Sequence, residues 1–365
     1  MSMPQAGTGG LPETSHWQML PESPLSPRID VAAVWAGDDA GHGAVVLWSG
    51  QDNQRAPGVG LPDGALYYPR EDRWQMMSAT NQPSPRHGAV AIWTGSRVLI
   101  WGGFVPNNDE PGGVYDPATD QWDTLPGCPY GVEAGNWPHA VWTGSRLLVF
   151  NQGVGASYDP SAQTWQPMSS VHAPYGLFAA SVWTGSRWIL WGGVTANEGS
   201  ITTNLGASYD PVSNTWKAIS TIGAPTKRHD AHAGWTGQAM IVWGGEEGGQ
   251  QVRDGGRYDV ATDTWQALPT RAEDAPWSVL NESVATTKQG LLVWGGLDGD
   301  HYSQGGTRWN DASRSWSALP TAGQPLQREY QAGVWTGAEL VIWGGYVQPT
   351  TGSLFELPSG ARYVP

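Results

Sequence analysis

Short apolar runs that end in an aromatic residue recur along the whole chain. They end at Trp48, Trp101, Phe150, Trp191, Trp243, Trp294 and Trp343. In six of the seven, a second position eight residues upstream carries a tryptophan or, once, a threonine: Trp93, Trp142, Trp183, Trp235, Thr286 and Trp335. The first unit has a longer connection, from Trp35 to Trp48. Apolar runs of this length with polar, glycine-containing turns between them predict β-hairpins.

A second pattern follows each of these hairpins. An aromatic residue stands seven positions before a tryptophan in six contiguous pairs: Tyr67 and Trp74, Tyr115 and Trp122, Tyr158 and Trp165, Tyr209 and Trp216, Tyr258 and Trp265, Trp309 and Trp316. Most of the intervening segments begin with Asp-Pro or a similar polar pair, which favours a tight turn between two strands. Each unit is therefore predicted to contain four strands.

Repeats of about 43 to 57 residues with four strands each are typical of β-propeller blades. The seventh unit lacks its tryptophan strand, because the sequence ends two residues after Tyr363. The missing piece matches the segment 16–21, His-Trp-Gln-Met-Leu-Pro. We therefore expect an all-β, seven-bladed propeller of four-stranded antiparallel blades, with an N-terminal strand completing the last blade and removing an exposed edge. We expect residues 16–365 to form this single domain and residues 1–15 to be a flexible segment.

Composition narrows the function classes. Glycine (50), tryptophan (23) and proline (28) are abundant, and the formal net charge is −14. Such an acidic chain repels nucleic acid and anionic membrane surfaces, and no apolar run approaches the roughly 18 residues of a membrane helix. With Cys128 as the single cysteine, neither an intrachain disulfide nor a cysteine-based metal cluster can form. We expect a monomer, and Met1–Ser15 does not read as a signal peptide. The compartment stays open, although few lysines and many tryptophans lean toward an exported protein.

The repeat residues resemble a known family. Gly-Gly after the second strand, tyrosine in the third strand and tryptophan in the fourth are marks of the kelch repeat. The Trp-Thr-Gly-Ser turn and the Val-Trp-Gly-Gly sequence look like its bacterial members. The resemblance covers residues 16–365 and implies a propeller. It leaves function open, because kelch propellers serve as enzymes, sugar-binding modules and interaction platforms.

Loop variation distinguishes the two faces of the predicted ring. The Trp-Thr-Gly turns and the turns from third to fourth strand share one face, which we call the uniform face. Connections from fourth to next first strand, and from second to third strand, lie on the opposite, variable face. Because recognition usually lies in variable loops on a rigid scaffold, we expect the functional site at the mouth of the central channel on the variable face.

Two positions near the start of each first strand supply the candidate residues. Seven residues before the first-strand aromatic, four units carry an arginine: Arg28, Arg86, Arg228 and Arg328. Five residues before it, the seven units carry Asp30, Gly88, Trp137, Phe178, Asp230, Asn281 and Tyr330. The arginines would bind a carboxylate, sulfate or phosphate. Alternatively, they cap loop carbonyls or pair with the aspartate two residues on. The second position changes chemistry from blade to blade, which indicates ligand contact.

The same region could support general acid–base catalysis without a cofactor. The candidate catalytic residues are His87, His229, Glu282 and Tyr330, with His139 as a further ligand-binding residue. A metal site is not expected, since His229 and His232 point to opposite sides of a strand.

Two function classes remain. The first is a propeller that binds a small polar or anionic ligand, such as a carboxylate, sugar acid or aryl acid, at the mouth, with or without turnover by lyase or epimerase chemistry. The alternative is a protein–protein interaction platform without enzymatic activity. A narrow pocket that brings the arginines, Tyr330 and a histidine together favours the first class. Exposed apolar residues at the rim favour the second.

Overall fold

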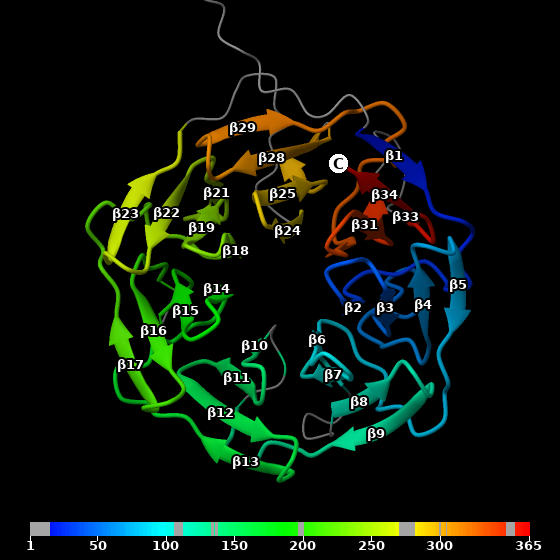
Figure 1. The fold of residues 1–365 in the computed structure, drawn as a ribbon, viewed down its shortest axis with the longest axis horizontal. Coiled ribbons are helices and arrows are strands. Elements are labelled where there is room, and N and C mark those ends of the chain that lie inside the picture. The colour runs from blue at the N-terminus through cyan, green and yellow to red at the C-terminus, as the bar shows by residue number, and fades with distance from the viewer. Residues whose placement is uncertain are drawn as a thin grey trace, which may run out of the picture.

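Seven four-stranded antiparallel sheets stand around a central axis in the computed structural model (Figure 1). The structure describes residues 15–105, 112–132, 135, 138–195, 201–269, 282–298, 301–303, 305–347 and 355–365. Within these residues every element is a strand, and no helix is long and apolar enough to cross a membrane. In each blade the first strand lies nearest the axis and the fourth at the periphery (Figure 1).

The strand bounds follow the aromatic pattern closely. Blade one contains β2 (Ala32–Gly37), β3 (Gly43–Trp48), β4 (Gly64–Tyr68) and β5 (Arg73–Met76), and blade two contains β6 (Val90–Trp93), β7 (Val98–Trp101), β8 (Gly112–Asp116) and β9 (Gln121–Leu125). Blade three contains β10 (His139–Trp142), β11 (Leu147–Asn151), β12 (Val154–Asp159) and β13 (Thr164–Pro167), and blade four contains β14 (Ala180–Trp183), β15 (Trp188–Trp191), β16 (Gly206–Asp210) and β17 (Thr215–Ala218).

The remaining blades carry extra hairpins. Blade five contains β18 (His232–Trp235), β19 (Ala239–Trp243), β22 (Gly255–Asp259) and β23 (Thr264–Ala267), and blade six contains β24 (Ser283–Thr287), β25 (Gly290–Trp294), β28 (Gly306–Asn310) and β29 (Ser315–Ala318). Blade seven contains β30 (Ala332–Trp335), β31 (Leu340–Trp343), β34 (Gly360–Val364) and β1 (His16–Met19). Two-stranded hairpins project from the variable face: β20 (Glu246–Glu247) with β21 (Gln250–Gln251), β26 (Leu297–Asp298) with β27 (His301–Tyr302), and β32 (Tyr346–Val347) with β33 (Phe355–Glu356).

The ring closes as the sequence predicts. β1 pairs antiparallel with β34, with Trp17 opposite Tyr363 and Met19 opposite Ala361. In Figure 1 the blue β1 lies beside the red β34 at the outer edge of the last blade. This pairing confirms the predicted N-terminal strand and removes an unpaired edge from the last sheet.

Aromatic residues join each blade to the next. The residue that ends the second strand of one blade packs against the fourth-strand tryptophan of the following blade. The ring centroids of Trp48 and Trp122 are 5.5 Å apart, and those of Trp243 and Trp316 are 4.7 Å apart. The indole N–H of Trp122 also donates to the carbonyl of Ser78 at 2.9 Å, which lies at the end of the preceding blade. The recurring tryptophans therefore bury the interfaces between blades, where aromatic pairs and their burial contribute most of the packing energy.

Candidate functional site at the mouth of the variable face

A cavity of about 730 Å³ opens at the centre of the ring on the variable face. It is formed by residues at and just before the first strands of most blades, so the predicted location of the mouth matches a real concavity. Its side chains include Asp30, His139, Phe178, Asp230, His232, Glu246, Glu282, Tyr330 and Gln331.

The position five residues before the first-strand aromatic has an unusual backbone. At the five of these positions that the structure describes, φ is positive: 53° at Asp30, 66° at Gly88, 56° at Phe178, 53° at Asp230 and 55° at Tyr330. A side chain in this conformation costs about 1 kcal/mol relative to glycine. Only Gly88 avoids that cost, and the other four direct a side chain into the cavity lining. Because the conformation recurs at every described copy of this position, it belongs to the repeat, and it directs four side chains to one opening.

This backbone conformation also links neighbouring blades. The N–H of Gly88 donates to the carbonyl of Asp30 at 3.1 Å, and the N–H of Asp230 donates to the carbonyl of Phe178 at 3.0 Å. Each bond joins the mouth position of one blade to that of the next. The opening is therefore framed by the main chain as well as by side chains.

The four arginines lie beneath the mouth, with their side chains buried in the protein interior. Arg28, Arg228 and Arg328 are 0 % exposed and Arg86 is 2 % exposed. Their guanidinium groups donate to the carbonyls at the ends of the second strands, which belong to Ser49, Gly102, Gly244 and Gly344, at 3.0 to 3.2 Å. None of the four lines the cavity.

These contacts favour carbonyl capping over ligand binding for the arginines. Where an arginine has a carboxylate partner, the aspartate is not the one two residues on. Arg28 pairs with Asp63 and Arg228 with Asp254, each at 2.6 Å. Residue spacing alone could not decide between ligand binding, carbonyl capping and pairing with a nearby aspartate. The observed carboxylate partners lie in the connection between the second and third strands, far from the arginines in sequence.

The cavity itself is acidic. Asp30, Asp230, Glu246 and Glu282 line it, and among the described residues no lysine or arginine does. The Glu282 side chain is fully buried, and both of its oxygens lack a hydrogen-bond partner within the described residues. Its nearest charged neighbour is His232, whose Nε2 lies 3.5 Å from Oε1. Burying a carboxylate is costly, and the ion pair with His232 is the compensation that the described residues provide.

Burial and charge tune the groups around Glu282. Burial alone would lower the pKa of His232, but Glu282 and Asp230 together raise it above its ordinary value. Burial raises the pKa of Asp30 against the opposing effects of the Gln51 amide, which donates at 2.7 Å, and of His87. Burial lowers the pKa of His139, whose Nε2 lies 2.7 Å from the carbonyl of Gly176 and donates to it.

The candidate catalytic residues are only partly brought together. Glu282 and Tyr330 line the cavity, whereas His87 and His229 do not. The ring of His87 stacks on Phe104 with centroids 4.9 Å apart, and Nδ1 of His229 lies 2.7 Å from Oδ2 of Asp230. Catalysis by this set stays a prediction. Trp137 and Asn281 lie outside the described residues, and the described residues contain no group of three potential metal ligands.

A neighbouring groove was not foreseen from the sequence. On the same face, between blades six and seven, a cavity of about 460 Å³ is lined by Tyr302, Gln324, Pro325, Leu326, Gln327, Val347 and Phe355. Leu326 is 65 % exposed and Phe355 is 40 % exposed. The groove adjoins the mouth through β32, because Tyr346 stacks on Tyr330 with ring centroids 5.4 Å apart. We call this feature the rim groove.

Comparisons with known proteins agree with the repeat pattern. Residues 177–358 match the family model described as the KLHDC2/KLHL20/DRC7 Kelch-repeats domain. Kelch-like protein terF of Aspergillus terreus is 25 % identical over 308 residues, which cover 73 % of this chain and 63 % of that protein. Kelch-like protein 25 of Xenopus tropicalis is 27 % identical over 184 residues, covering 47 % and 28 %.

A third relative has an enzymatic name. The N-(sulfonatooxy)prop-2-enimidothioate sulfolyase of Thlaspi arvense is 30 % identical over 145 residues, covering 33 % of this chain and 41 % of that protein. The chain thus spans less than two thirds of the length of each of these relatives. The matches support the kelch resemblance and do not show the narrower likeness to bacterial members.

Proposed function

Because the matches support a kelch-repeat β-propeller, we propose that the chain is a protein-interaction module whose variable face binds a partner segment carrying a lysine or arginine side chain. Kelch proteins commonly bind protein partners. The observation that carries the proposal is the position of an acidic cavity and an exposed apolar groove side by side on one face.

The charge of the mouth selects the chemistry of the occupant. Four carboxylates line the cavity, the described part of the chain places no lysine or arginine there, and the formal net charge of the protein is −14. An anionic ligand was the expectation from the arginines, but their guanidinium groups are buried and engaged with carbonyls. A cationic group gains from this field, and an anionic one is repelled.

Glu282 provides the deepest contact. Its two oxygens have no exposed surface in the described conformation, so a guanidinium or ammonium of the partner reaches them by displacing His232, whose side chain is 29 % exposed. Such a donor offsets the cost of burying the carboxylate without hydrogen bonds. The aromatic rings of Phe178 and Tyr330, which also line the cavity, can pack against the side chain of the occupant or face its charge.

The rim groove gives the segment its second contact. Leu326 and Phe355 expose apolar surface that a neighbouring apolar residue of the partner would cover. An interface with an apolar contact beside one charged anchor is typical of peptide recognition on a preformed surface. The occupant is therefore an extended segment with a basic residue close to an apolar one.

The test is a titration with defined peptides. Isothermal titration of capped nonapeptides that place one arginine or lysine at varying distances from a leucine or phenylalanine should reveal saturable binding. The same peptides with glutamine for the basic residue should bind at least about tenfold more weakly, the cost of one charge-assisted contact. Glu282→Gln should weaken the basic peptides by a similar factor.

The matched control is Glu71→Gln, because Glu71 is exposed in a turn on the uniform face. This variant should bind as the unmodified protein does. Equal affinity for basic and glutamine peptides, or binding of sugar acids with no peptide binding, would contradict the proposal.

A further inference from the structure

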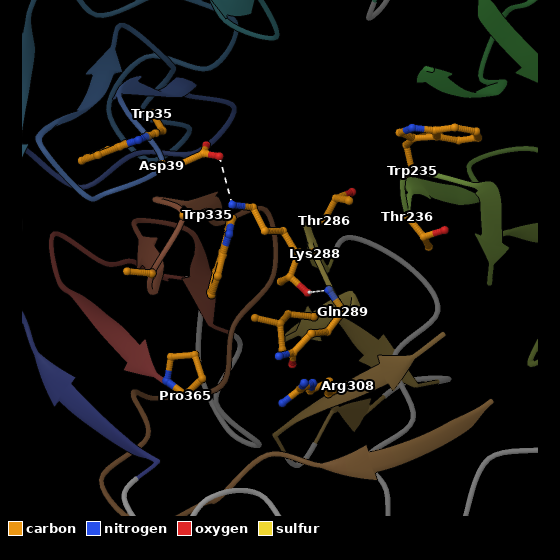
Figure 2. Close-up of a pocket in the computed structure, with 15 residues that line it drawn as sticks. Trp35, Asp39, Trp235, Thr236, Thr286, Lys288, Gln289, Arg308, Trp335 and Pro365 are labelled. Atoms are coloured by element: carbon orange, nitrogen blue, oxygen red, sulfur yellow. Dashed lines mark hydrogen bonds and ion pairs between the residues drawn. The ribbon is translucent and has the colours of Figure 1, made fainter. Parts of the chain in front are cut away.

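A second cavity, of about 580 Å³, opens on the uniform face, opposite the mouth. Figure 2 shows it between Trp35 and Trp335 on one side and Trp235 on the other, with Thr286, Lys288, Gln289 and Arg308 between them. The uniform turns are the most regular part of the repeat. The cavity occurs where blade six departs from that regularity.

The first departure is Thr286. Six blades carry a tryptophan at this position, and in the described structure each of those indoles is half-buried at the uniform end of its blade. Trp335 packs in the cluster formed by Ala285, Leu292 and Leu340, between blades six and seven. With threonine in blade six, the corresponding indole between blades five and six is missing. The volume that this indole would take contributes to the cavity between Trp335 and Trp235 (Figure 2).

The second departure is the environment of Arg308. Three blades carry an arginine at the equivalent place in the third strand: Arg257, Arg308 and Arg362. Arg257 pairs with Asp311 at 3.1 Å, and Arg362 pairs with Glu339 at 3.5 Å. No hydrogen bond or ion pair within the described residues reaches the guanidinium of Arg308, which lines the cavity. A half-buried guanidinium without an acceptor is an anion-binding group.

The third departure is the turn itself. Blade six has Lys288 after Thr287, where five other blades have a glycine after the threonine, and this places a lysine at the cavity entrance. Lys288 pairs with Asp39 of blade one at 3.1 Å, but both side chains are more than four-fifths exposed. An exposed pair of this kind contributes little stability, so Lys288 can turn to another carboxylate.

From these three features we propose that the second cavity binds a flat aromatic carboxylate. The ring lies in the space beside Thr286, against Trp335 and Leu292, and the carboxylate accepts hydrogen bonds from Arg308, with Lys288 closing the entrance. The ligand supplies both groups that blade six lacks relative to its neighbours: the aromatic ring of the first-strand tryptophan and the carboxylate partner of the third-strand arginine. This site is separate from the proposed peptide site on the other face.

Isothermal titration and ligand-observed saturation-transfer NMR with indole-3-carboxylate test the proposal directly, with the neutral indole-3-carboxamide as its partner compound. The carboxylate should bind saturably and at least about tenfold more tightly than the carboxamide. Arg308→Gln should remove this preference. Thr286→Trp should abolish binding of both compounds, because the new indole fills the space, while thermal melting shows that the variant is folded.

Arg314→Gln is the matched control, since Arg314 is exposed in the following turn of the same blade and is not part of the cavity. It should bind as the unmodified protein does, and so should Glu282→Gln on the opposite face. Absence of saturable binding by the unmodified protein would overturn the proposal. Unchanged affinity for the carboxylate in either Arg308→Gln or folded Thr286→Trp would overturn it as well.

Discussion

Trp17 packs against Tyr363 with ring centroids 5.3 Å apart, although the two residues belong to the first and last strands of the chain. Trp17 also contacts Trp294 of blade six at 5.5 Å, and its indole N–H donates to the carbonyl of Pro320 at 2.8 Å. It therefore makes in blade seven the contacts that Trp122 makes in blade two. We call the pairing of β1 with β34, together with the contacts of Trp17, the seam of the ring. The seam has the same kinds of contacts as the other interfaces between blades.

Trp17→Ala should lower the free energy of unfolding by about 3–5 kcal/mol, because it empties a buried aromatic position and breaks the bond to Pro320. Urea unfolding followed by far-UV circular dichroism measures the loss. Met19→Ala is the control, since Met19 lies on the same strand and is 50 % exposed. It should change stability by about 0.5 kcal/mol or less. Similar values for the two variants would contradict the role given to the seam.

Arg228→Met should destabilise the protein by about 1–3 kcal/mol, the usual cost of leaving a buried acceptor without its donor. The substitution leaves the carbonyl of Gly244 and the carboxylate of Asp254 without their donor. Basic-peptide binding at the mouth should be unchanged. Arg187→Met, at an exposed ion pair with Asp210, is the control and should cost about 1 kcal/mol or less. Unchanged stability with lost binding would instead assign Arg228 to ligand recognition.

Glu356 should make the stability of the folded protein depend on pH. Burial, with Asp52 and Asp30 nearby, raises the pKa of Glu356 to about 7, although the N–H of Asn53 donates to its Oε1 at 2.7 Å. Because the folded pKa lies above the unfolded one, the contribution of this group to stability is present below about pH 4.5. It is then lost as the pH rises toward 7. The rim between blades seven and one should therefore weaken in mildly alkaline solution.

Glu356→Gln should remove this pH dependence. At pH about 8 the variant should be more stable than the unmodified protein by roughly 2–3 kcal/mol, and near pH 4 the two should be equal. Urea unfolding at a series of pH values measures the difference. Glu71→Gln, at an exposed position, should follow the unmodified protein throughout. A constant difference between Glu356→Gln and the unmodified protein across the series would contradict this assignment.

The fold could be predicted from the sequence because the aromatic positions are also the strand ends. Trp101 and Trp343 end second strands, and Trp122 and Trp265 lie in fourth strands, as their spacing indicated. The match between the N-terminal segment and the other tryptophan strands was enough to predict the seam. Repetition supplied seven examples of each position, so that an irregular unit such as the first did not obscure the register.

For the candidate site at the mouth, only the location of the cavity could be predicted from the sequence. Spacing gives the place of Asp30 or Arg228 along a strand, but the direction of a side chain depends on the backbone conformation. The positive φ at Asp30 brings that side chain to the cavity, while Arg228 turns inward to carbonyls contributed by a distant connection. The second cavity had a visible signal, since Thr286 is the exception in a column of tryptophans. Because the turns of the uniform face are nearly identical, we did not expect a binding site on that face from the sequence.

The hydrogen bonds from Gly88 to Asp30 and from Asp230 to Phe178 have a consequence for the size of the opening. They join blade two to blade one and blade five to blade four, so the opening cannot widen at these two places without separating neighbouring sheets. At these two places the backbone fixes the width of the opening. The same backbone conformation carries an acid at residue 230 and an aromatic ring at residue 178. The chemical surface of the opening can therefore differ from blade to blade while the scaffold stays the same.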